Sequence, residues 1–289
     1  NSFLITVTGT NDAPVATFSD PQNATEDQNA PLTGQLTAND VDSSDLQYEL
    51  IGAQIPGLNI DSNGDWSFDT TDEAYQNLAD GESKQITVNY SVTDDNGKSD
   101  NSSFVINLTG TNDAPQATFD TEKFTNEGQS IQGQLTSFDV DVDDVATYQL
   151  NPSGVDQTRI ESAAIAVANA LTANDQAQIA DAQRYQSLLN SFETQITNNN
   201  GDIPGLNLDS TTGSWSFDPT DDIYKTLAAG DELVLRVQYQ AEDSNGLTGD
   251  NSFLITVTGT NDAPVATFSD PQNATEDQNA PLTGQLTAN

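Results

Sequence analysis

The side chains in this sequence that could do chemistry are almost all carboxylates. Forty-five Asp and Glu residues stand against seven Lys and Arg residues, the net charge is −38, and the chain has neither His nor Cys. Without His and Cys, the usual zinc, copper and haem ligand sets and the common nucleophile–base pairs are excluded. No glycine-rich loop precedes a Lys-Ser/Thr pair, so the sequence has no phosphate-binding loop. Carboxylate and amide oxygens remain as the chemical groups of interest.

Three patterns of acids and amides recur along the chain: an Asn-Asp pair, an Asp-Val-Asp segment and an Asp in an Asn-Gly turn. They are Asn11-Asp12, Asn112-Asp113 and Asn261-Asp262; Asp40/Asp42 and Asp139/Asp141; and Asp94 and Asp243. In extended chain, the two acids of Asp-Val-Asp point to the same side, which suits shared coordination. Ca²⁺ takes about six to eight oxygen ligands of these kinds. The recurrence therefore predicts calcium sites, with solvated turn residues as the alternative for each acid.

Two other uses of the acids fit the sequence less well. A carboxylate pair could hydrolyse a glycoside, but Asp94-Asp95 becomes Asp243-Ser244 in the second copy of its segment. A catalytic pair should not lose a member in one copy, so we expect no enzyme. The segment Asp61–Asp65 begins like an EF-hand loop but lacks the glutamate at the twelfth position, and it predicts a hairpin turn.

Repetition defines the predicted organisation. Residues 1–39 return unchanged at 251–289, and the heptapeptide TGTNDAP occurs three times, with its glycine at Gly9, Gly110 and Gly259. The intervals of 101 and 149 residues predict two modules in a tandem array, the second enlarged by an insertion. The predicted parts are the last strand of a preceding repeat (1–10), one repeat (11–110), a second repeat (111–260) with an insertion at about 157–198, and the start of a next repeat (261–289).

The shared parts of the two modules predict β-strands. Apolar residues alternate with polar ones at Phe3, Ile5 and Val7, and the same alternation occurs around 86–92, 104–108 and 233–239. Period two indicates one buried and one exposed face. Short runs of this kind between Asn-Gly and similar turns are typical of an antiparallel β-sandwich. Trp66 and Trp215 are interpreted as core residues, and the fold is predicted to be all-β apart from the insertion.

The insertion predicts an α-helical hairpin, because glycine and proline are absent from 157–198 and alanine, glutamine and leucine dominate. Asn174 or Asp175 is expected to cap the second helix. Two apolar stripes are expected to pack on each other and on the sandwich. They comprise Ile160, Ala164, Val167, Ala168 and Leu171, and Ile179, Ala182, Tyr185, Leu188, Leu189, Phe192 and Ile196.

The charge limits the partners. An acidic surface repels nucleic acid and anionic membranes, and no apolar stretch is long enough to span a bilayer. Divalent cations are the expected partners. The chain has no methionine, so we expect it to be part of a longer gene product.

The motifs TGTNDAP, Thr-Glu followed by Asp or Gly, GQLT-x-x-DVD, W-x-F-D and Asp-x-Asn-Gly together resemble those of the VCBS-type, cadherin-like repeats of giant bacterial RTX adhesins. The resemblance covers nearly all of the chain except the helical insertion. It implies calcium in the junctions between successive modules. Asn112 and Asp113 would join Asp139, Asp141 and Asp243 of the following module and Glu26 of the preceding one. Asp72 or Glu73 would add a further acid, at a spacing that differs from the family's.

The same resemblance assigns two further junctions. The upstream one would use Asn11, Asp12, Asp40, Asp42 and Asp94. The downstream one would use Asn261, Asp262 and Glu127, but the chain ends one residue before the expected Asp-x-Asp. That site should be incomplete here.

The function implied is mechanical. Calcium would neutralise the repelling acids and stiffen short linkers, so that tandem modules form an extended rod. The resemblance implies type I secretion, a bacterial cell-surface location, and the projection of distal adhesive domains for cell adhesion or biofilm formation. An alternative is an adhesion module that binds a glycan or protein through the helical insertion or a sandwich loop. A secreted polysaccharide hydrolase is a third possibility.

Overall fold

The computed structural model describes residues 2–142, 144–264 and 266. These residues form two compact units. The first contains the described residues of Asn1–Ala117, Ser137–Thr147 and Ala241–Gly249, and the second contains those of Thr118–Thr136, Tyr148–Gln240 and Asp250–Asn289.

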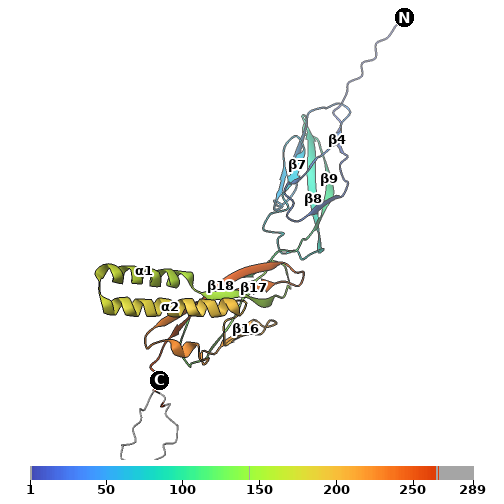
Figure 1. The fold of residues 1–289 in the computed structure, drawn as a ribbon. Helices are drawn as coiled ribbons and strands as arrows, with labels where there is room; N and C mark the ends of the chain where they lie inside the picture. The colour runs from blue at the N-terminus through green and yellow to red at the C-terminus, as the bar shows by residue number, and fades with distance from the viewer. Residues whose placement is uncertain (1, 143, 265, 267–289) are drawn as a thin grey trace, which may run out of the picture. The chain divides into compact units, whose positions relative to one another are not determined.

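Residues 15–109 form a β-sandwich of two principal sheets (Figure 1). One sheet has the order β2 (Gln22–Thr25), β9 (Ser99–Thr109), β8 (Ser83–Asp94) and β5 (Leu46–Leu50). The other has the order β3 (Leu32–Gln35), β7 (Asp65–Phe68) and β6 (Leu58–Ile60), and β1 (Val15–Ala16) pairs with β4 (Ala38–Asn39). All pairs are antiparallel except β2 with β9. The parallel pair places the end of β2 beside the end of β9, at Thr25 and Thr109.

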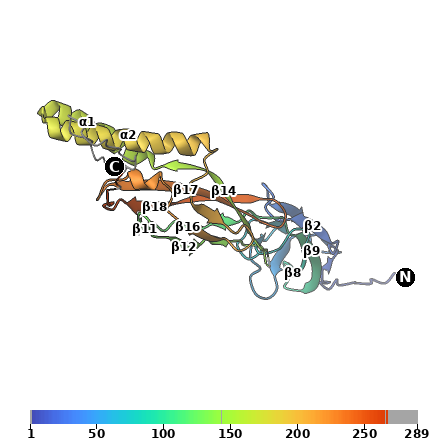
Figure 2. The same ribbon diagram turned by 60° about the horizontal axis from the view of Figure 1, so that its bottom comes forward.

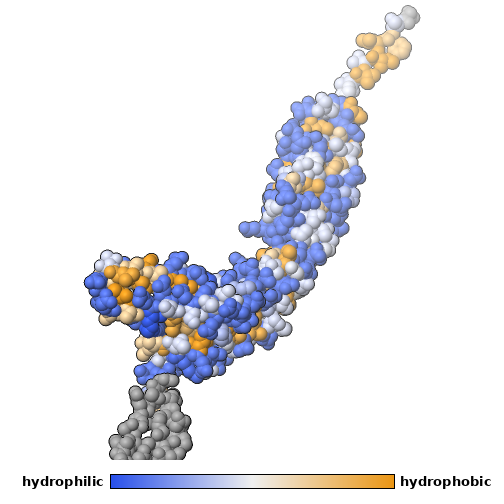
Figure 3. Space-filling view, in the orientation of Figure 1, coloured by the Kyte–Doolittle hydropathy of each residue, from blue (hydrophilic) through white to orange (hydrophobic). Residues whose placement is uncertain are grey.

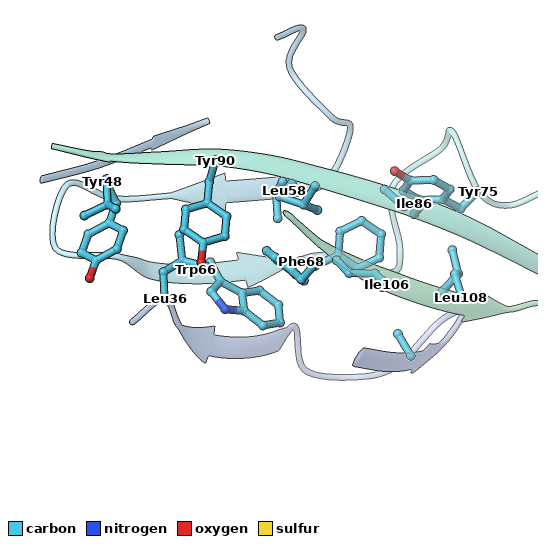
Figure 4. Packing of buried hydrophobic residues seen from close by; sticks show 14 of the residues in the cluster. Leu36, Tyr48, Leu58, Trp66, Phe68, Tyr75, Ile86, Tyr90, Ile106 and Leu108 are labelled. Carbon is cyan, nitrogen blue, oxygen red and sulfur yellow. The ribbon is translucent and has the colours of Figure 1, made fainter. Parts of the chain in front are cut away.

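The core of this sandwich is aromatic and lies between the two sheets (Figure 4). Trp66 is buried, and its ring centroid is 5.1 Å from that of Phe104. The hydroxyl of Tyr90 donates to the carbonyl of Phe18 at 2.7 Å. A Cβ at Gly34 would come within 2.5 Å of the Trp66 indole, so this strand position has room only for glycine. The interpretation of Trp66 as a core residue is confirmed.

Residues 116–258 repeat the same strand order. The four-stranded sheet has β11 (Lys123–Asn126), β18 (Thr248–Thr258), β17 (Glu232–Glu242) and β14 (Thr147–Val155), and the three-stranded sheet has β12 (Ile131–Gln134), β16 (Ser214–Phe217) and β15 (Leu206–Leu208). The pair β10 (Gln116–Ala117) and β13 (Ser137–Phe138) matches β1 and β4, and a 3₁₀ turn spans Tyr224–Thr226. Trp215 occupies the core as Trp66 does. The predicted β-sandwich fold is confirmed.

The insertion is a helical hairpin of α1 (Gln157–Ala173) and α2 (Gln176–Asn198), which lie side by side in both views (Figure 1, Figure 2). The carboxylate of Asp175 accepts from the backbone N–H groups of Ala177 and Gln178, so Asp175 is the cap of α2. From α2, Leu189, Phe192 and Ile196 are buried. The Phe192 ring packs 5.7 Å from that of Tyr224, which anchors the hairpin to the second sandwich.

The stripe predicted for α1 is confirmed only in part, because only Ile160 and Val167 of its residues are half-buried. Ala163 and Ala170 are the buried residues of α1, whereas Ala164, Ala168 and Leu171 are exposed. Six of the eleven residues from 163 to 173 are alanine. Because alanine fits on either face, the apolar period does not determine which face turns inward.

The prediction that residues 1–10 are the last strand of a preceding repeat stays a prediction. Residues 2–10 carry no strand, and Phe3 and Leu4 are exposed. The identical residues 252–258 lie in β18 between β11 and β17, with Phe253, Ile255 and Val257 buried. A strand needs partner strands for its backbone groups, and only the second copy has them among the described residues. Most of the predicted next repeat, 261–289, lies outside the described residues.

Candidate metal centre

Carboxylates from four separate segments converge around the linker that follows β9. The linker supplies Asn112 and Asp113, the turn after β13 supplies Asp139, Asp141 and Asp144, the turn between β17 and β18 supplies Asp243, and the residue after β2 is Glu26. All of these residues belong to the first compact unit. The sheet registers bring them together: β2 ends beside β9, and β17 and β18 are neighbouring strands.

The turn at Asp243 holds one carboxylate in a fixed orientation. Its Oδ1 accepts from the backbone N–H groups of Asn245 and Leu247 at 2.8 and 2.9 Å. Its Oδ2 accepts from the side-chain amide of Asn112 at 2.8 Å. In turn, Asn245 donates its side-chain amide to Asn112 Oδ1 at 2.9 Å. The Asp-x-Asn-Gly sequence is therefore what ties this turn to the linker.

The Asp-Val-Asp segment lies in a turn just after β13, not in the extended chain that the sequence suggested. Asp139 Oδ1 accepts from the backbone N–H of Asp141 at 3.0 Å. Asp141 Oδ2 accepts from the backbone N–H of Asp113 at 2.9 Å. The acids converge because each carboxylate binds a backbone N–H, rather than because of strand alternation.

Several carboxylate oxygens in this cluster are buried without a hydrogen-bond donor. They are Asp113 Oδ2, Asp139 Oδ2 and Asp141 Oδ1. Oxygens of Asp139, Asp144 and Asp243 also lie within 4.8 Å of one another. A buried charged oxygen with no partner costs free energy unless a proton or a cation neutralises it.

The pKa values of three acids in this cluster are raised above their ordinary values. Burial and the neighbouring Asp27, Asp141 and Asp139 raise the pKa of Asp113. Burial also raises the pKa of Asp141. Glu26 has its pKa raised to about 7 by burial, although the Thr111 N–H opposes the shift. None of the ion pairs formed by the described lysines and arginines involves these acids.

These ligands fit a hard divalent cation. All the donor groups are carboxylates, an asparagine amide and backbone, which are the ligands of Ca²⁺ and Mg²⁺, whereas structural zinc prefers Cys and His. Asp113, Asp139, Asp141, Asp144, Asp243 and Glu26 could hold such ions. Three carboxylates with oxygens within 4.8 Å of one another favour Ca²⁺, because Mg²⁺ usually retains several waters and takes one or two carboxylates.

The upstream group repeats this arrangement. Asn11 donates its side-chain amide to Asp94 Oδ2 at 2.8 Å, and this contact lowers the pKa of Asp94. The backbone N–H of Asp12 lies 3.2 Å from Asp42 Oδ2, and that of Asp42 donates to Asp40 Oδ1 at 2.9 Å. Asp40 Oδ2 is buried without a donor. The structure thus brings Asn11, Asp12, Asp40, Asp42 and Asp94 close together, and their use as metal ligands stays a prediction.

Glu26 and Glu127 occupy equivalent places. Glu26 Oε2 accepts from the Thr111 N–H and Glu127 Oε2 from the Thr260 N–H, both at 3.1 Å. At the downstream position, Asn261 donates to the carbonyl of Asp262. A metal site at Asn261, Asp262 and Glu127 stays a prediction.

Two acids near the cluster, Asp27 and Asp144, were not predicted from the sequence. Asp144 accepts from both the N–H and the hydroxyl of Ser244, at 3.1 and 2.7 Å, so it supplies a carboxylate where Ser244 lacks one. Asp27, at a positive φ of 56°, raises the pKa of Glu26 and Asp113. Both have a local signal in the sequence, since Asp144 extends the acidic run after Asp141 and Asp27 follows Glu26, but their contacts depend on the fold. Asp72 caps a local turn through the Ala74 N–H, at 3.0 Å.

The comparisons with known proteins bear on the fold. The model of the bacterial Ig domain family matches residues 11–107, so this part of the chain is similar to bacterial Ig domains. No curated protein sequence matches the chain.

Similar solved structures are those of cadherins. Human CDH23 EC21-23 is 16% identical with a TM-score of 0.48, covering 96% of this chain and 79% of that one. Human Protocadherin-24 EC1-2 is 12% identical with a TM-score of 0.46, covering 86% and 99%. Drosophila N-cadherin EC1-4 is 15% identical with a TM-score of 0.43, covering 86% of this chain, which spans about half (51%) of that structure.

The fold class is therefore an Ig-like β-sandwich with an inserted pair of helices. Ig-like domains are structural modules, and no catalytic family is indicated. Within the described part of the chain, no helix has both the length and the apolar character needed to cross a bilayer.

Proposed function

We propose that this chain is a calcium-stiffened extender of a bacterial cell-surface adhesin, exported by type I secretion. The observation that carries the proposal is the set of buried, donor-free oxygens on Asp113, Asp139 and Asp141. No described lysine or arginine forms an ion pair with these three acids. Their mutual repulsion in the metal-free state makes a divalent cation the natural partner.

Calcium would act through the linker. Asp113 lies on the linker, Asp139, Asp141 and Asp144 in one turn, and Asp243 in another. A cation bound by all three segments fixes the linker to those turns, so each linker of this type would resist bending once loaded. Extracellular calcium modules have dissociation constants of about 10⁻⁴–10⁻³ M. At ten to a hundred times that concentration, binding adds about 1.4–2.7 kcal/mol of stability per site.

The repeated sequence supports a length-setting role. Residues 1–39 and 251–289 are identical, which gives a period of 250 residues. Chains built of such repeats form quasi-one-dimensional arrays, and bacterial Ig-like domains are typically extracellular. The −38 net charge keeps such an array soluble but makes its parts repel each other, and calcium would remove part of that repulsion.

The test is the maximum dimension of the chain in solution, measured by small-angle scattering with calcium and with a chelator. For the native sequence we expect a larger and better defined maximum dimension with calcium. The double variant Asp139→Asn/Asp141→Asn should lose this response and most of its calcium binding by calorimetry. Asp20→Asn/Asp80→Asn removes the same charge from exposed positions and should keep both.

The experiment distinguishes a wrong metal site from a wrong stiffening role. An equal calcium response in the two double variants would show that the converging acids are not the site. Calcium binding without any change in the maximum dimension would leave the metal site standing and refute the stiffening role.

A further inference from the structure

The outer face of α1 is an apolar surface without a partner in the described part of the chain. Ile165 is 60% exposed and Leu171 is 54% exposed, and Ala164 and Ala168 between them are exposed too. At about 100° per residue, these four positions cover an arc of about 120° on one side of the helix. The arc lies away from Ala163 and Ala170, which pack inward. The space-filling view shows apolar surface gathered over this part of the hairpin (Figure 3).

This surface carries little charge in a chain that is otherwise strongly acidic. Residues 157–198 contain two basic and four acidic side chains, so nearly all of the −38 net charge lies elsewhere. From Ser162 to Ala173, α1 has no charged residue, and the exposed Glu161, one turn before Ile165, is the nearest charge on this side of the helix. Two copies of this chain repel one another wherever their sandwiches approach. At the hairpin face they meet with far fewer like charges, those of Glu161 and Asp175 at the two ends of the contact.

We propose that α1 docks antiparallel on α1 of a second copy of this chain, crossing at Ala168. An isologous contact requires one patch that is complementary to itself, and the arc has this property. Ile165 and Leu171 lie three residues on either side of Ala168. An antiparallel pair centred there brings Ile165 of each copy to the same level as Leu171 of the other, while the small Ala168 side chains let the helices approach closely.

The small area of this patch limits the affinity of a single contact between two copies. One exposed arc on a 17-residue helix buries less than the roughly 1,200 Å² of a stable standard interface, so a single pair of hairpins binds weakly. The 250-residue sequence period would repeat the hairpin along an array. Linked weak contacts gain about 10²–10⁴-fold in overall affinity when geometry allows simultaneous binding. The hairpin therefore fits lateral pairing of neighbouring chains, a role additional to the stiffening proposed above and independent of the calcium site.

A cysteine trap tests the contact in the intact chain, which has no cysteine of its own. Ala168→Cys places one thiol at the proposed crossing point, and we expect it to form a disulfide-linked dimer under mild oxidation. Ala180→Cys, at an exposed alanine of α2, is the matched control and should stay largely monomeric. Equal dimer yields from the two variants would overturn the proposal.

Sedimentation velocity over a concentration series supplies the second measurement. The native chain should show a weight-average mass that rises with concentration, with and without calcium. Ala168→Glu should abolish the rise, whereas Ala180→Glu, with the same added charge on α2, should not. A native chain that stays monomeric throughout would refute self-association. So would a loss of binding to whole cells in Ala168→Glu with no change in mass, because the face would then dock a different partner.

Discussion

Glu26 is the residue at which the effect of a bound cation on stability should be easiest to measure. It is 2% exposed and its pKa is about 7, compared with about 4.5 for an ordinary glutamate. An acid whose pKa is higher in the folded state stabilises the fold fully below its unfolded pKa, and this stabilisation is lost as pH rises through the folded pKa. The window is therefore pH 4.5 to 7.

We expect the free energy of unfolding of the metal-free chain to fall by up to about 2 kcal/mol between pH 5.5 and 7.5 from this group. Calcium should reverse the trend, since the ion favours the ionised carboxylate. Urea denaturation at both pH values checks this, with Glu26→Gln expected to flatten the dependence and Glu49→Gln, an exposed glutamate, to leave it unchanged. An unaltered pH dependence in Glu26→Gln would assign the effect to other acids.

Residue patterns predicted which acids recur but not how the structure arranges them. The recurrent Asn-Asp and Asp-Val-Asp segments located Asp113, Asp139 and Asp141 because repetition is visible in sequence. Asp144 escaped notice because its importance depends on Ser244, which is distant in sequence and has lost the acid of its counterpart, Asp95. Contacts of this kind depend on the fold and cannot be obtained from local spacing.

At the scale of elements, an ion pair fixes the start of α1 to β17. Arg236 donates to Asp156 at 2.6 Å, and Asp156 is only 3% exposed. Removing the arginine leaves a buried carboxylate that keeps a hydrogen bond from the Thr158 hydroxyl but has no cation. We expect Arg236→Met to lower the free energy of unfolding by about 1–3 kcal/mol, a range reduced because the arginine itself is partly exposed.

The matched control is Lys225→Met, which removes one partner of the exposed pair with Asp222. It should cost less than about 1 kcal/mol, since exposed ion pairs contribute little. Urea titrations followed by circular dichroism measure both variants. Equal losses would mean that the pair with Asp156 does not hold the hairpin in place.

Element types were predictable where the apolar period was clear. Alternation identified the long strands, and Asp175 marked the start of α2. The buried side of α1 was not predictable from the sequence. Its many alanines fit on either side of the helix, so packing against the neighbouring elements decides which side is buried. Residues 2–10 carry no strand for a related reason: these residues are suited to a sheet, but partner strands decide whether a sheet forms.

At the scale of the whole molecule, the ten identical residues at 1–10 and 251–260 give a built-in comparison of one sequence in two environments. Residues 2–10 are described as exposed chain, whereas 252–258 lie between hydrogen-bonded neighbours in β18. In deuterium exchange, peptides cut from the two places share one mass, so they should appear as a single species with two isotope envelopes of equal intensity. One should label at once and the other only after local opening. A single envelope would show that the backbone amides of both copies are equally protected from exchange, and that the strand in β18 gives its copy no extra protection.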